Sequence, residues 1–138
     1  MLKTVATGLM ILTLALPAHA QEKGKTVRLA DLEIGLGEAG YGVKQDTAEL
    51  KAGTSYRMWL KATGKMPCAF QAGEFFKTVT WRKIEVNKVE IKAPVVTEIE
   101  FEDEGSAELF FTPTKAGEYT WVCEGLADKG MTGKFVVK

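Results

Sequence analysis

Histidine is nearly missing from this chain, whose 138 residues include only His19. The rest of the chain therefore has neither histidine general-base chemistry nor a histidine-built metal site. No nucleophile–base pair appears either, which argues against hydrolytic activity. Net charge is also missing, because 18 basic side chains balance 18 acidic ones. A near-neutral chain gives no reason to expect nucleic acid or an anionic membrane as a partner.

The sequence has only one long apolar run, at residues 5–16. This run follows Lys3 and precedes the small residues around His19. This pattern is typical of a cleaved signal peptide over residues 1–20. The alternative is an uncleaved membrane anchor, but the run is shorter than the roughly 20 residues that span a bilayer. We predict cleavage near Ala20/Gln21, a periplasmic location, one domain over residues 21–138 and no membrane span in the mature chain.

The remaining sequence reads as β-structure separated by glycine turns. Residues 56–61 and 98–102 alternate apolar and polar side chains, the period of half-buried strands. No convincing amphipathic helix appears, and short strands at this spacing indicate a sandwich or a barrel. The expected strands are 27–34, 47–50, 56–61, 86–91, 98–102, 107–111, 119–123 and 135–137, with a glycine-rich loop over 35–42. Met58, Trp81 and Trp121 are expected in the core.

The C-terminal residues 117–134 resemble the last hairpin of the cupredoxins, in which a Gly-x-Tyr strand carries a cysteine ligand. Cys123 stands at that cysteine position, and Met131 stands at the position of the axial methionine. Leu126 takes the place of the histidine between them, and Cys68, after Met66-Pro67, takes the place of the upstream histidine. Type 1 copper needs two imidazoles, so the resemblance implies that this site does not form here.

A closer resemblance is to the EfeO-type cupredoxin-like domain and to the periplasmic cupredoxin component of Ftr-type ferrous iron transporters. It rests on Pro67-Cys68, Glu74-Phe75-Phe76 and the Cys123 hairpin, and it covers residues 26–138. It implies an all-β, cupredoxin-like Greek-key β-sandwich that binds copper, iron or both. It also implies a ferroxidase-type redox role, with an inner-membrane iron permease and other periplasmic iron-uptake proteins as partners.

The same resemblance places Cys68 and Cys123 at one metal, so their sulfurs are expected close together. Two interpretations stay open. One is a structural disulfide, as is usual for an exported protein with two cysteines. The other is a thiolate pair that holds a soft ion such as Cu(I), with Met131 or Met66 as thioether. With a permanent disulfide, the domain would be a non-redox copper-binding or chaperone module.

Carboxylates supply the candidate iron ligands. Glu74 is the first, either as a partly desolvated ligand or as a surface acid at the start of a strand. Glu102 and Asp103 offer hard oxygen donors, although acids at a hairpin tip are usually only solvated. Glu124 is a further candidate because it follows Cys123 directly.

Overall fold

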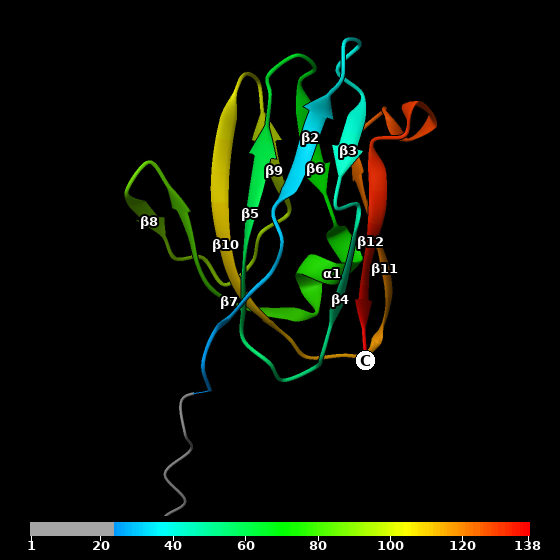
Figure 1. Cartoon of the computed structure of the whole chain (residues 1–138). Coiled ribbons are helices and arrows are strands. Elements are labelled where there is room, and N and C mark those ends of the chain that lie inside the picture. Colours follow the sequence, from blue (N-terminus) through cyan, green and yellow to red (C-terminus); the bar gives the residue numbers. More distant parts are fainter. Residues whose placement is uncertain (1–23) are drawn as a thin grey trace, which may run out of the picture.

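The computed structural model describes residues 24–138, so the leader predicted for residues 1–20 lies outside the described part. Two β-sheets lie face to face, with a short helix between them (Figure 1). The elements in chain order are β1 (Val27–Arg28), β2 (Leu32–Leu36), β3 (Gly42–Lys44), β4 (Thr47–Leu50), β5 (Tyr56–Ala62), β6 (Cys68–Gln71), α1 (Gly73–Lys77), β7 (Val79–Val86), β8 (Val89–Ile91), β9 (Glu98–Phe101), β10 (Gly105–Pro113), β11 (Gly117–Cys123), the 3₁₀ turn η1 (Ala127–Lys129) and β12 (Thr132–Val137). In this part of the chain no helix is long and apolar enough to cross a membrane.

The chain passes repeatedly from one sheet to the other. One sheet has the order β3-β2-β5-β10-β7-β8, with β1 beside β5, and the other has the order β4-β12-β11-β6-β9. Successive strands such as β5 and β6, or β9 and β10, therefore lie in different sheets, and the core fills the space between the sheets. The predicted all-β sandwich is confirmed.

Side-chain alternation explains why these strands pack as they do. Along β5 every second side chain is buried, and Met58 is 1% exposed, as expected for the core. Trp121 is fully buried, and its indole N–H donates to the Asp46 carbonyl at 2.8 Å. Gly133 lies opposite Trp121 in the β11–β12 ladder, where a Cβ would collide with that carbonyl oxygen. A glycine is thus needed for β12 to approach the segment before β4.

The structure corrects the sequence interpretation around Glu74, where α1 forms instead of the start of a strand. Phe75 and Phe76 are both buried although they are adjacent in the sequence. A helical turn directs both rings inward, and Phe75 stacks on Phe135 with ring centroids 4.2 Å apart.

Other expected boundaries also shift. The expected loop over 35–42 contains the end of β2 and the start of β3, and the strand expected over 27–34 is two strands separated at residues 29–31. Trp81 is half-buried and packs against the core rather than lying within it.

Candidate sulfur site at one end of the sandwich

Two neighbouring strands of the five-stranded sheet bring the cysteines together. Cys123, the last residue of β11, is in register with Phe70 on β6, two residues from Cys68. The cysteine Cα atoms are 5.0 Å apart and the two sulfurs form a disulfide. Cys68 is 1% exposed and Cys123 is fully buried. Of the two states that the sequence left open, the structure therefore presents the disulfide.

Met131 lies directly across the terminal hairpin from Cys123. The Cys123 N–H donates to the Met131 carbonyl at 2.9 Å, and the Met131 side chain is fully buried. Residues opposite each other in a hairpin project to the same face, so the Met131 thioether shares its side of the sheet with the Cys123 sulfur. Three sulfur-bearing side chains therefore gather at one end of the core.

Leu126 closes this end where the resemblance would place a histidine. Its N–H donates to the Cys123 carbonyl at 2.9 Å, and its carbonyl accepts from the Met131 N–H at 3.2 Å. The half-buried Leu126 side chain packs against the core. Because residues 24–138 contain no imidazole, the donors at this end do not fit type 1 copper, which needs two.

Several candidate ligands surround this end on the surface. Phe101 pairs with Cys68 across β6 and β9, so Glu102 and Asp103 emerge at the same end, and both are exposed. Glu124 is exposed too, and its N–H donates to the Ala69 carbonyl at 3.0 Å.

Met66 lies two residues before Cys68 and is half-buried against Gly40. Met66 is thus a fourth sulfur near this end, outside the group of buried sulfur-bearing side chains formed by the two cysteines and Met131.

Glu74 is not brought to the sulfur end. It lies on α1, whose Phe75 packs against Tyr119 with ring centroids 5.6 Å apart. Tyr119 precedes Cys123 by four residues of strand, which is roughly 13 Å. The Glu74 side chain is 79% exposed and pairs with Lys77 at 2.9 Å.

The oxidation state decides what this end can do chemically. Within residues 24–138 no group of three or more His, Cys, Asp and Glu side chains is placed to hold a metal ion. Disulfide sulfurs are not thiolates, and the thiolate is the form that binds a metal. The donors that reduction would release, two thiolates and the Met131 thioether, are soft and suit Cu(I).

Comparison with known proteins identifies the fold to which this architecture belongs. The sequence matches no protein-family model and no curated protein. The structure resembles a laccase from Pediococcus acidilactici Pa5930, with a TM-score of 0.61 and 14% identity over 95% of this chain and 31% of that one. It also resembles a multicopper oxidase from Campylobacter jejuni, with a TM-score of 0.57 and 14% identity over 91% of this chain and 34% of that one. This chain has the cupredoxin fold.

The cupredoxin fold accounts for where the sulfurs lie. The chain spans about a third of the length of these oxidases, and the likeness concerns backbone architecture. Within the cupredoxin fold, β6 and the β11–β12 hairpin meet at the end that carries Cys68, Cys123 and Met131.

One surface feature went unnoticed in the sequence. A groove runs beside β9, lined by residues that include Val86, Ile99 and Phe101. Its only sequence signal was the alternation of acids with Ile99 and Phe101, which identified a strand without indicating that one of its edges is open.

Proposed function

We propose that this chain is an exported, periplasmic cupredoxin-like component of a bacterial ferrous iron uptake system. In this role it binds copper through sulfur and assists Fe(II) oxidation or delivery to an inner-membrane permease. One observation carries the proposal: Cys68, Cys123 and Met131 gather at the same buried end of the sandwich. Soft sulfur ligands select Cu(I) over hard divalent ions.

Copper binding by the two cysteine sulfurs requires that the disulfide be opened first. Reduction of the Cys68–Cys123 bond takes up two electrons and two protons, which a dithiol reductant supplies while it is oxidised to its own disulfide. Loss of the two thiol protons then yields the thiolates that hold Cu(I), so copper affinity rises with pH.

Iron would be held by hard carboxylates rather than sulfur. Glu102, Asp103 and Glu124 support this part of the proposal, because they emerge at the sulfur end and are exposed. Glu74 is separated from them along the sandwich and would have to act as an independent ligand. A Glu74→Gln variant tests that separate role, because an exposed side chain with one surface ion pair contributes little to stability.

The direct experiment is a Cu(I) titration of anaerobically reduced protein against a coloured Cu(I) chelator. We expect one Cu(I) per reduced chain and none per oxidised chain. Met131→Leu keeps the side-chain volume and should weaken binding. Met58→Leu is the matched control, since Met58 is equally buried but lies within β5, paired with Leu109. Failure of the reduced chain to take up Cu(I), or equal losses in both variants, would refute the copper site.

The iron role is tested in cells. Deletion of the gene should slow growth on limiting Fe(II) and leave uptake of Fe(III) chelates intact. Complementation with the Met131→Leu variant should fail, and complementation with Met58→Leu should succeed. Normal Fe(II) uptake in a deletion strain that lacks other ferrous transporters would refute the iron role while leaving the copper titration to be judged separately.

A second candidate is a non-redox copper-binding or chaperone module with a permanent disulfide. The observation that favours it is the burial of both cysteines, because a buried bond resists attack by an external thiolate. Thiol counting on protein taken anaerobically from the periplasm separates the candidates. Two free thiols per chain support the redox component, and none supports the permanent disulfide.

A further inference from the structure

The strand β9 leaves one edge of the five-stranded sheet open. On one side it pairs with β6 over four residues, from Cys68 with Phe101 to Gln71 with Glu98. Within residues 24–138 no other strand pairs with it, and its remaining backbone groups make no turn or loop hydrogen bond to other backbone atoms. Unpaired N–H and C=O groups along such an edge are a template for one more strand.

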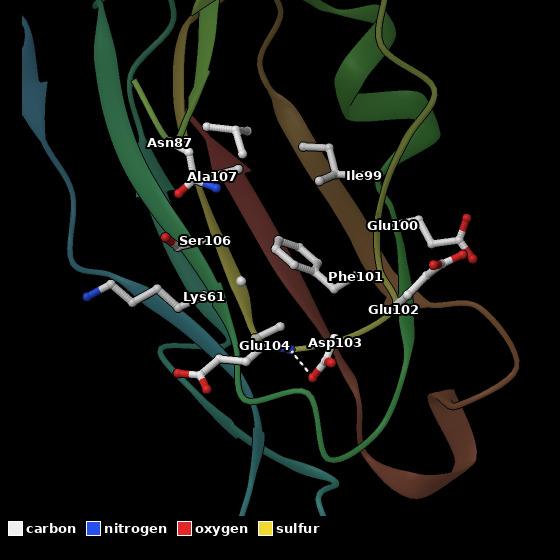
Figure 2. A pocket seen from close by; sticks show the side chains of 13 residues that line it. Lys61, Asn87, Ile99, Glu100, Phe101, Glu102, Asp103, Glu104, Ser106 and Ala107 are labelled. Carbon is white, nitrogen blue, oxygen red and sulfur yellow. Dashed lines mark hydrogen bonds between the residues drawn. The ribbon is translucent and has the colours of Figure 1, made fainter. Parts of the chain in front are cut away.

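A groove with apolar and polar walls runs along this open edge, between β9 in one sheet and β5, β10 and the β7–β8 turn in the other. One section, of about 700 Å³, is lined by Ile99, Phe101 and Ala107 together with polar side chains such as Asn87 and Ser106 (Figure 2). A second section, of about 350 Å³, shares Val86 and Ile99 with the first and continues to Val95. Val95 is 64% exposed, and Val89 and Ile91 of β8 are exposed as well. These exposed apolar side chains beside an open strand edge are contacts that an added strand could use.

The rim of the groove is acidic. Figure 2 shows Glu100 and Glu102 pointing away from the groove side of β9, while Ile99 and Phe101 point into it. Glu98, Glu100, Glu102, Asp103 and Glu104 are all exposed, and none of them forms an ion pair with a residue of the described chain. Lys61, which lies nearby, is held by Asp31 at 2.6 Å. Glu98 accepts a hydrogen bond from the neutral Gln71 amide at 2.9 Å, so within the described residues no cation neutralises these acids.

From these three features we infer that β9 and its groove bind an extended segment of a partner protein in which basic and apolar residues alternate. The segment adds a strand to the β9 edge. Its apolar side chains enter the groove beside Ile99 and Phe101, and its basic side chains lie on the outer face opposite Glu98 and Glu100. Backbone hydrogen bonds provide affinity and alternate side chains provide specificity in this mode of recognition.

Charge selects this occupant over a second copy of the chain. Pairing of β9 with β9 across a two-fold axis would set Glu98 and Glu100 of one copy against the same acids of the other, and like charges directly opposite are destabilising. A basic segment turns the same acids into attractive cross-strand partners. The inference does not depend on the sulfur site, so failure of the proposed function would leave it intact.

The test uses the whole protein and a fluorescein-labelled peptide of seven alternating lysine and valine residues. The variant Glu98→Lys/Glu100→Lys should weaken peptide binding about tenfold, since two surface ion pairs are replaced by two repulsions. The matched control is Glu38→Lys/Glu49→Lys, which changes the net charge equally. Glu38 lies in the β2–β3 loop and Glu49 on β4, the opposite edge of the same sheet. All four side chains are exposed, so folding should be retained.

Two N-methylated peptides separate strand addition from simple charge attraction. One carries N-methyl groups on every lysine and the other on every valine, so that each blocks a single edge of the extended peptide. We expect one of them to lose binding and the other to retain it, together with backbone amide shifts in residues 98–101. Val95→Ser should also weaken binding, because it removes an exposed apolar contact at the end of the groove.

Three results would overturn the inference. The first is equal peptide affinity for the β9 variant and its charge-matched control. The second is equal binding of both N-methylated peptides, which would mean attraction by charge alone. The third is a wild-type chain that self-associates and does not bind the peptide, provided that Glu98→Lys/Glu100→Lys leaves this self-association unchanged or strengthens it.

Discussion

The disulfide between Cys68 and Cys123 closes a loop of 55 residues, and this closure should contribute strongly to the stability of the fold. The loop spans everything from β6 to β11, more than a third of the chain. In the chain-entropy relation, closing a loop of this length in the unfolded state stabilises the fold by about 4 kcal/mol at 25 °C. That is a large share of the 5–15 kcal/mol that stabilises a typical domain.

The perturbation is a double-mutant cycle of Cys68→Ala, Cys123→Ala and the double variant. Either single change opens the loop, so each should lower the free energy of unfolding by about 4 kcal/mol. The double variant should lose little more than either single one, giving a coupling energy of similar size. An unfolding entropy of about 2.1 cal/mol/K per residue gives about 240 cal/mol/K for residues 24–138. With that entropy, a loss of about 4 kcal/mol should lower the melting temperature by roughly 15–20 °C.

The assays are calorimetry and urea unfolding of oxidised protein, reduced protein and each variant. Opening the loop lets the unfolded chain expand, so the m-value should rise together with the loss of stability. A reducing phosphine should destabilise the wild-type chain and leave the double variant unchanged, which serves as the control. Additive losses in the two single variants, or a phosphine effect below about 1 kcal/mol, would refute the reasoning from loop closure.

Three further predictions concern packing, pH and copper. Gly133→Ala should lower the free energy of unfolding by about 1–3 kcal/mol in urea, because the added Cβ collides with the Asp46 carbonyl. A change of less than about 0.5 kcal/mol, the size expected of a neutral surface substitution, would show that β12 moves away freely. The hydrogen bond from Lys61 holds the pKa of Asp31 below its ordinary value of 3.8. At a pH above 3.8, Asp31→Asn should therefore lower the free energy of unfolding by no more than about 1 kcal/mol. That difference should vanish as the pH falls through the lowered pKa, and a loss that persists in acid would contradict the ion-pair explanation. Cu(II) should give no intense blue band by absorption spectroscopy, since residues 24–138 lack imidazole, and a strong blue colour would show a different ligand set.

Local patterns in the sequence were enough to predict the kind of fold. The alternation along residues 56–61 and 98–102 reflects a strand with one buried face, and β5 and β9 form there. The terminal hairpin was expected from the resemblance of residues 117–134 to the last cupredoxin hairpin, and its two strands, β11 and β12, are close in sequence. Such features depend on neighbours along the chain and can therefore be read without knowing the tertiary structure.

The tertiary structure alone decided the features that depend on distant partners. Glu74-Phe75-Phe76 became a helix because Phe135, 60 residues away from Phe75, receives the Phe75 ring, and no local periodicity reports that contact. The meeting of Cys68 with Cys123 was expected only from resemblance, and it requires β6 to lie beside β11 in one particular register. The open edge of β9 follows from its place last in the sheet, which is a property of the order of strands and not of its own four residues.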